Sequence, residues 1–351
     1  ATTEIYTLSL PDALPIFPFH VWEIGVDGSG LRQVTSGPWH DFNPVYGPGG
    51  LIVFCSSRVA SYSLCQDYLA SALHTCNADG SDVRRIDFTT LCTSAPSILP
   101  DGRILCTRWE YQDKNIFSWQ GLWTLGVDGR QLRLFFGNTL TVPNSLYGGR
   151  PVPGSDRVLF TMAAHHHPPV GDVAVIDRLG RLEDPAAVTK ATFETPYVPT
   201  VGSTWRDTNW SPGDRYFPQA AADPWPVDGA RFLVSAGNAA RGNATPFRLC
   251  IAFTNGVRFP LLSADDAGFF AGVSLAPRPE PPALPDRAPQ EPGEGTCYVQ
   301  DVHRGLEEQG VRRGQVASLR VVRVLPKKWN TEGPRFHDHY RTEEGRVGKE
   351  G

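Results

Sequence analysis

The feature that most constrains the fold of this chain is a repeated unit: an alternating strand that ends in an Asp-Gly-type turn. Copies occupy residues 21–30, 73–80 and 122–129, with weaker ones at 173–180 and 249–256. The turn glycines Gly28, Gly80, Gly129 and Gly180 are 52, 49 and 51 residues apart, and the step to Gly256 is 76. The chain therefore carries an internal repeat of about 50 residues, with an insertion or a degenerate copy before the fifth turn.

A second motif interleaves with the first. Residues 44–54 and 96–106 each read as a strand, a Pro/Gly-rich turn and an apolar strand, and looser copies lie at 151–160 and 224–234. Asp-Gly supplies the positive φ angles of a two-residue hairpin turn, so each unit holds two hairpins. A four-stranded sheet cannot bury both faces alone, and its copies pack radially as blades. We therefore predict an all-β fold, a β-propeller of five to six four-stranded blades, with six favoured.

Composition supports a turn-rich β protein. The chain has 35 Gly and 31 Pro, only 20% charged residues and 11% aromatic residues, and this aromatic content argues against disorder. The formal charge of −4, from 33 basic and 37 acidic residues, gives no reason to expect a nucleic-acid partner. No apolar run approaches 18 residues, so no membrane span is predicted.

The domain boundaries follow from changes in composition. Residues 1–17 resemble translated sequencing adapter, and we interpret them as a non-native leader; a genuine first strand is the alternative. The propeller is expected at 18–276, a Pro-rich linker at 277–294, and the start of a small β domain at 295–330. Residues 331–351 form a polar tail whose end also resembles adapter sequence.

The hairpin sequences at 27–30 and 100–103 resemble TolB-type β-propeller repeats. The region from Arg108 to Asp177 is more particular: its segments 109–111, 122–124, 153–155 and 164–166 resemble the propeller domain of the hydrazine synthase alpha subunit family. The segment 298–306 fits the same family, and the resemblance covers roughly residues 20–325. It implies a periplasmic or otherwise exported protein.

The resemblance also bears on cofactors. Hydrazine synthase carries c-type haems attached by Cys-x-x-Cys-His motifs, and this chain has none. The family propeller offers a histidine for zinc and, four residues later, a tyrosine that ligates haem iron. His166 matches the histidine, but Val170 stands at the tyrosine position and cannot ligate iron. The resemblance therefore implies at most a zinc-binding remnant at His166, and haem is not supported.

The residues themselves give a similar picture of this cluster. His165, His166 and His167 are consecutive, and since side chains alternate along a strand, at most two share one metal ion. Zinc prefers three or four ligands, which His74, Asp172 or a cysteine would have to complete. The metal candidates are His166 and His165; a structural cluster at the rim is the alternative.

Two other groups of residues are weaker candidates. Glu110 and Asp113 lie beside Trp109 and Tyr111, where a buried carboxylate pair would serve acid–base chemistry; inter-blade packing is the alternative. Calcium would need oxygen ligands from a Pro-, Trp- and Asp-rich region, at Asp207, Asp214, Asp223 and Asp228, but no EF-hand spacing is present. We assign no catalytic and no cofactor-binding residue.

The seven cysteines stand at 55, 65, 76, 92, 106, 250 and 297, without a Cys-x-x-Cys motif. The odd number favours buried free thiols over a complete disulfide set, with one or two disulfides as the alternative.

Two functions fit the sequence best. The first is a non-catalytic scaffold or interaction module of a larger exported protein, whose partner is another protein or neighbouring domains of the same polypeptide. The second is a part of a haem- and metal-dependent redox enzyme of nitrogen metabolism, with its haem domains outside this sequence. A hydrolase or lyase that uses the Asp-rich loop with a divalent ion is a third, weaker hypothesis.

Overall fold

The computed structural model contains β-strands and three short 3₁₀ helices, and no α-helix among the residues it describes. Those residues are 3–8, 18–59, 61–62, 69–89, 91–109, 120–140, 143, 145–163, 169–179, 181–192, 220–238, 245–284, 299, 301–303, 306–324 and 342–346. They fall into a first unit (1–59 and 70–284) and a second unit (60–69 and 285–351). None of the helices described is long and apolar enough to cross a membrane.

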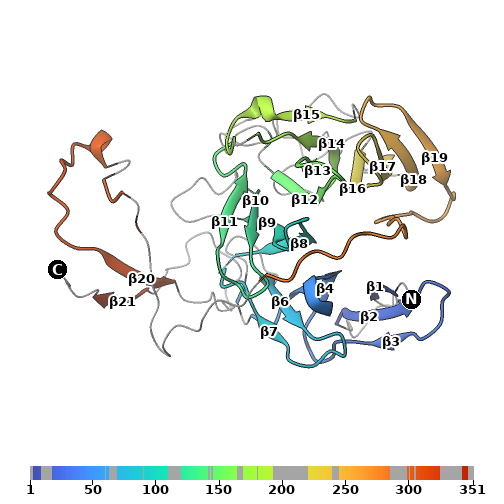
Figure 1. The fold of residues 1–351 in the computed structure, drawn as a ribbon, viewed down its shortest axis with the longest axis horizontal. Coiled ribbons are helices and arrows are strands. Elements are labelled where there is room, and N and C mark those ends of the chain that lie inside the picture. Colours follow the sequence, from blue (N-terminus) through green and yellow to red (C-terminus); the bar gives the residue numbers. More distant parts are fainter. Residues whose placement is uncertain are drawn as a thin grey trace. The chain divides into compact units, whose positions relative to one another are not determined.

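The first unit contains a three-stranded sheet, a four-stranded sheet and a twelve-stranded sheet (Figure 1). The twelve-stranded sheet divides into three groups of four strands that are consecutive in sequence and antiparallel within each group, and we number the resulting five groups as sheets 1 to 5. Sheet 1 contains β1 (Thr3–Leu8), β2 (His20–Gly25) and β3 (Arg32–Gln33). Sheet 2 contains β4 (Asp41–Tyr46), β5 (Ile52–Ser56), β6 (Ala72–Cys76) and β7 (Arg84–Arg85). Sheet 3 contains β8 (Thr93–Ile98), β9 (Ile104–Trp109), β10 (Gln120–Leu125) and β11 (Arg133–Phe136).

The remaining two sheets of the first unit repeat this order. Sheet 4 contains β12 (Ser145–Pro151), β13 (Val158–Ala163), β14 (Gly171–Ile176) and β15 (Val188–Lys190). Sheet 5 contains β16 (Ala220–Pro226), β17 (Arg231–Asn238), β18 (Thr245–Phe253) and β19 (Arg258–Leu262). Two 3₁₀ helices, η1 (Pro48–Gly50) and η2 (Pro185–Ala187), lie in connections. One residue pair joins sheet 3 to sheet 4 (Gln120 with Ser145), and another joins sheet 4 to sheet 5 (Gly171 with Ala221).

The long step of the sequence repeat lies between sheets 4 and 5. These sheets are direct neighbours, so no other sheet separates them. The extra residues of the step lie in the connection from β15 to β16, most of which (193–219) is outside the described residues.

The Asp-Gly turns differ from the two-residue hairpins predicted above. In the first copy the N–H of Gly28 donates to the carbonyl O of Gly25 (2.8 Å), and the N–H of Gly25 donates to that of Ser29 (2.8 Å). Gly28 has a φ of +82°, whereas Asp27 keeps a negative φ. This is a three-residue loop that ends in a left-handed glycine, a geometry that suits hairpins as well as the two-residue turn does.

The aspartate of each such turn has its own local role. Oδ1 of Asp27 accepts hydrogen bonds from the backbone N–H (3.0 Å) and the hydroxyl (2.7 Å) of Ser29. Asp79 accepts the same pair of hydrogen bonds from Ser81. An aspartate side chain that caps the backbone two residues later stabilises the turn, which explains why the sequence repeats Asp-Gly-Ser.

The hydrophobic core lies between neighbouring sheets. In β5, Ile52 and Phe54 pack with Val21 of sheet 1, whereas Val53 and Cys55 pack with Ile104 of sheet 3. Alternate side chains of one strand thus point to opposite faces, and both faces are buried, as every residue of β5 is. Similar clusters join sheet 3 to sheet 4 and sheet 4 to sheet 5. The sequence predicted that a single sheet cannot bury both of its faces and packs against its neighbours, and the structure shows this packing.

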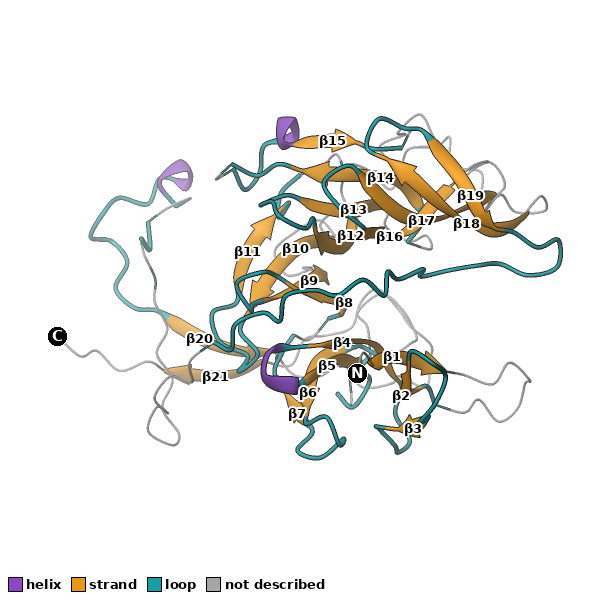
Figure 2. Cartoon of the chain, turned by 45° about the vertical axis from the view of Figure 1, so that its right-hand side comes forward, coloured by secondary structure: helices purple, strands orange, loops and turns teal. Residues whose placement is uncertain are grey.

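The first strands of sheets 2 to 5 line the inside of this arrangement. β4 contacts β8, β8 contacts β12, and β12 contacts β16 (Figure 1). The chain then returns: after β19, residues 263–284, called the return segment below, run back from sheet 5 and pass between β8 and β4 in both views (Figure 2).

The second unit has few described elements. A 3₁₀ helix, η3 (Glu307–Gln309), precedes a two-stranded antiparallel sheet of β20 (Arg320–Val324) and β21 (Thr342–Arg346). Nη2 of Arg313 pairs with Oδ2 of Asp301 at 2.7 Å and ties the segment around η3 together.

Candidate functional site

The predicted metal site falls outside the part of the chain that the structure describes. His165, His166 and His167 belong to the undescribed residues 164–168. Val170, at the position of the family's haem-ligating tyrosine, is described: it is buried and packs with Ala220, Ala222 and Phe247. Its side chain contributes to apolar packing.

The additional ligands proposed for zinc are engaged elsewhere. His74 on β6 is buried, its Nδ1 lies 3.0 Å from the carbonyl O of Ala72, and burial lowers its pKa. Asp172 on β14 of another sheet is buried and pairs with Nζ of Lys190 at 2.5 Å. Over the described residues, no three His, Cys, Asp or Glu side chains form a metal-binding group.

The acid–base and calcium candidates are not brought together where the structure describes them. Trp109 ends β9 and is buried, whereas Glu110, Tyr111, Asp113, Asp207 and Asp214 lie outside the described residues. Asp228 sits in the β16–β17 turn, where its carboxylate binds Arg231 at 2.7 Å. Asp223 lies on β16 itself, in a different environment that is described below.

Five cysteines are described, at 55, 76, 92, 106 and 250, and all five are free thiols. Cys55, Cys76, Cys106 and Cys250 are buried, and burial raises the pKa of each. The expectation of buried free thiols is confirmed for these four positions. Cys65 and Cys297 are outside the described residues.

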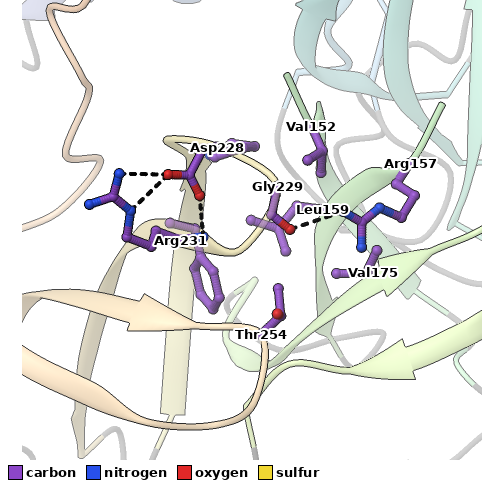
Figure 3. Close-up of a pocket in the computed structure, with 10 residues that line it drawn as sticks. Val152, Arg157, Leu159, Val175, Asp228, Gly229, Arg231 and Thr254 are labelled. Carbon is purple, nitrogen blue, oxygen red and sulfur yellow. Dashed lines mark hydrogen bonds and ion pairs between the residues drawn. The ribbon is translucent and has the colours of Figure 1, made fainter. Parts of the chain in front are cut away.

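A small cavity between sheets 4 and 5 is a packing gap rather than a ligand site (Figure 3). Its volume of about 10 Å³ is at the lower limit for one water molecule. Nη2 of Arg157 donates to the carbonyl O of Gly229 across it at 2.9 Å. The gap marks where two turns of neighbouring sheets meet.

A feature that the sequence analysis did not find is a bulge repeated in the first strand of each four-stranded sheet. The register shifts at the same place in β4, β8, β12 and β16. At each shift one residue adopts a positive φ and is followed by Pro or Gly. These pairs are Asn43-Pro44, Ala95-Pro96, Gly148-Gly149 and Asp223-Pro224.

The bulge has a physical consequence for what the inner strands present. A positive φ is costly for a residue with a side chain, and such strain concentrates at functional positions. The extra residue also changes the direction of the side chains that follow it. Beside the β4 bulge, Phe42 and Val45 pack in a core cluster, whereas residues beside the other three bulges contact one another.

The side chains at this level form a connected group on three strands. Nη1 of Arg150 on β12 donates to the carbonyl O of Pro96 on β8 at 3.2 Å. The guanidinium carbon of Arg150 lies 5.2 Å from the ring centre of Trp225 on β16. Tyr147 and Asp223, from the same two bulges, interact electrostatically with Arg150. We call Tyr147, Arg150, Asp223 and Trp225 the inner-strand cluster.

Burial dominates the electrostatics of this cluster. It raises the pKa of Tyr147 to about 12, so the phenol stays protonated and keeps its hydrogen bond with Ser94. It also raises the pKa of Asp223, against the opposing effect of Arg150 and the backbone N–H of Ala271, and it lowers the pKa of Arg150. Perturbed titratable groups that share one partly buried place are typical of functional sites.

Chemically, the cluster is suited to binding. It offers a cation, a carboxyl group, a phenol and an indole, and the Nε1 of Trp225 is buried without a hydrogen-bond partner among the described residues. It contains no nucleophile paired with a base. Aromatic residues and arginine are the side chains that contribute most at protein interfaces.

The comparisons with known proteins bear on the fold. No protein-family model matches the sequence, and no curated protein matches it. Among solved structures, hydrazine synthase of Kuenenia stuttgartiensis matches with a TM-score of 0.57 and 15% identity, over 75% of this chain and 37% of that chain. TolB from Acinetobacter baumannii matches with a TM-score of 0.46 and 16% identity, over 76% of this chain and 54% of that one.

The first of these matches establishes the architecture: the five sheets belong to a β-propeller domain. The predicted all-β propeller fold is confirmed. At 15% identity the likeness extends to the fold alone, and this chain spans 37% of the hydrazine synthase chain that it matches.

Proposed function

We propose that this chain is the interaction module of a larger exported protein, and that it binds a protein partner or a neighbouring domain through the inner-strand cluster. The observation that carries this proposal is the cluster itself. Two bulged strands, β12 and β16, hold Tyr147, Arg150 and Trp225 together, and the cluster lacks the nucleophile–base pair that covalent chemistry would need.

We also infer that the five sheets are five blades of a six-bladed propeller. Neighbouring sheets from 1 to 5 contact one another through their strands. Among the described residues, sheets 5 and 1 share no extensive strand contact, so one further blade between them would complete the ring.

The test starts with the gene. Sequencing it past both ends of this chain identifies the neighbouring domains, which are then expressed and titrated against the full chain by calorimetry. Binding is expected, and Trp225→Ala should weaken it by about tenfold or more, as loss of an aromatic anchor does. Phe259→Ala is the matched control, because Phe259 is 56% exposed on the outermost strand β19.

Two results would overturn the proposal. One is an equal loss of affinity in Trp225→Ala and Phe259→Ala, which would mean that the partner does not bind specifically at the inner strands. The other is a set of Cys-x-x-Cys-His motifs in the flanking sequence together with zinc that is lost in His166→Ala. That result would favour a part of a haem- and metal-dependent redox enzyme.

A further inference from the structure

The return segment contacts the inner-strand cluster directly. The guanidinium carbon of Arg278 lies 4.1 Å from the ring centre of Trp225, closer than that of Arg150. The backbone N–H of Ala271 interacts with the carboxyl group of Asp223. Two of the four cluster residues are thus already contacted by a later part of the same chain.

The segment is fixed at both ends. Near its start, the N–H of Phe269 donates to the carbonyl O of Phe247 on sheet 5 at 2.8 Å. Near its end, it reaches the β8–β9 turn of sheet 3, where a Cβ added at Gly102 would lie 2.2 Å from the carbonyl O of Pro282. The turn glycine of sheet 3 therefore provides the space in which the segment lies.

The side chains of the segment are nevertheless accessible to solvent. None of its residues is buried, and Arg278 itself is exposed. Segments with few buried contacts detach at low free-energy cost. Its contact with the cluster is also incomplete, because it leaves the indole N–H of Trp225 without a hydrogen-bond partner among the described residues.

The sequence of the segment indicates what the cluster recognises. Arg278 stands between Pro277 and Pro279, and Pro281 and Pro282 follow. Proline-rich stretches favour an extended conformation and lose little entropy on binding, and aromatic surfaces recognise them. An arginine between prolines adds a cation for the face of Trp225, as Arg278 does in this chain.

We propose that the return segment is an internal ligand of the inner-strand cluster, and that a partner's extended, proline-rich segment carrying an arginine displaces it and binds the same residues. The proposal rests on the proposed function and specifies the chemistry of the partner. A carbonyl group of the partner at the indole N–H of Trp225 would supply the contact that the internal ligand lacks.

The test uses the full chain and a labelled synthetic peptide with the sequence of residues 274–284, with binding followed by fluorescence anisotropy. The wild-type chain should bind the peptide weakly, because the tethered segment competes at a high effective concentration. Arg278→Ala in the chain weakens the internal contact and leaves the cluster intact, so the peptide should bind this variant about tenfold more tightly. A peptide with alanine at the position of Arg278 should bind neither chain measurably.

The cluster side is tested by combining Arg278→Ala with Trp225→Ala or Trp225→Phe. The alanine variant should lose the peptide, and the phenylalanine variant should keep part of the affinity, because phenylalanine retains an aromatic face. Thermal melting of each variant separates a loss of binding from a loss of folding.

The outcomes separate the two proposals. No peptide binding to the Arg278→Ala chain, or equal affinity for both peptides, overturns the internal-ligand proposal. If a neighbouring domain still binds in a manner that depends on Trp225, the proposed function stands and only the internal-ligand proposal is wrong. If neither the peptide nor a neighbouring domain binds, both are wrong.

Discussion

Gly129 of sheet 3 lies against Ile86 of sheet 2: a Cβ added at position 129 would be 2.4 Å from the carbonyl O of Ile86. Gly80 of sheet 2 meets Val34 of sheet 1 in the same way, with a corresponding distance of 2.1 Å. The turn of one sheet is thus seated on the backbone of the previous sheet. The glycine of the Asp-Gly turn serves the contact between sheets as well as the turn.

This relationship predicts different costs for the same substitution in two copies of the turn. Gly28 also has a positive φ, but a Cβ there would meet no atom within 4 Å. Gly28→Ala should lower the free energy of unfolding by about 1–2 kcal/mol, the cost of the backbone conformation. Gly129→Ala adds a clash with backbone and should cost roughly 3 kcal/mol or more in urea titrations. Equal losses of unfolding free energy in the two variants would contradict the close contact of the Gly129 turn with the backbone of Ile86.

The buried pair of Asp172 and Lys190 predicts a large effect of a single truncation. The side chain of Asp172 is fully buried, and Nζ of Lys190 lies 2.5 Å from its Oδ2. Lys190→Met should destabilise the fold by about 3 kcal/mol, because it leaves a buried carboxylate without its cation. Arg181→Ala breaks the exposed pair with Asp184 and should change stability by less than about 0.5 kcal/mol. Chemical denaturation of both variants checks the contrast.

Asp223 predicts a pH dependence. Burial raises its pKa above the ordinary 3.8, so between pH 3.8 and the folded pKa the folded chain binds this proton more strongly than the unfolded chain does. Its contribution to stability is therefore present below pH 3.8 and is lost as the pH rises through the folded pKa. Asp223→Asn mimics the protonated form and tolerates the φ of +51°. The variant should be more stable than wild type at neutral pH, and the difference should shrink toward pH 3.8.

Asp228 is the matched control with the opposite sign. Hydrogen bonds from the backbone N–H of Ala230 and from Arg231 lower its pKa, so its contribution is present above pH 3.8 and is lost as the pH falls through the folded pKa. Asp228→Asn should be less stable than wild type at neutral pH, with a difference that disappears in acid. Denaturation curves across the pH range separate the two carboxyl groups. A stability gain for Asp228→Asn at neutral pH would contradict the assignment.

The cysteines predict a labelling pattern. Burial raises the pKa of Cys76 to about 11, and it raises that of Cys106 as well, so both thiols stay protonated and shielded near neutral pH. Iodoacetamide should leave them unmodified in the folded chain and label them in denaturant, whereas Cys92, which is only partly buried, should react first among the five described cysteines. Peptide mass spectrometry identifies the modified positions.

Much of the fold was predictable because it depends on short local patterns. The Asp-Gly repeats at Gly28, Gly80 and Gly129 mark turns, and the consecutive apolar residues of the second motif, such as Ile52 and Val53, mark strands that are covered on both faces. The exact turn type was mispredicted. Both turn types use Asp-Gly, and the choice depends on hydrogen bonds such as that of Gly25 with Ser29.

The candidate site was not predictable in the same way. Arg150, Trp225 and Arg278 are separated by 75 and 53 residues, and only the packing of the sheets and the return of the chain bring them together. The bulges offered a weak signal, since Pro or Gly follows each positive-φ residue. The residues at these sites, Asn43, Ala95, Gly148 and Asp223, share no side-chain type that would mark them in the sequence.

The sequential order of the strands has a consequence for how this chain folds. Each sheet pairs strands that are adjacent in sequence, so a sheet can form before it needs any segment from a later sheet. Contacts between sheets also join consecutive units, which allows each sheet to assemble on the one made just before it during synthesis. The return segment is the exception: it reaches Gly102 only after sheet 5 is complete, so its docking is a late event in the folding of the first unit.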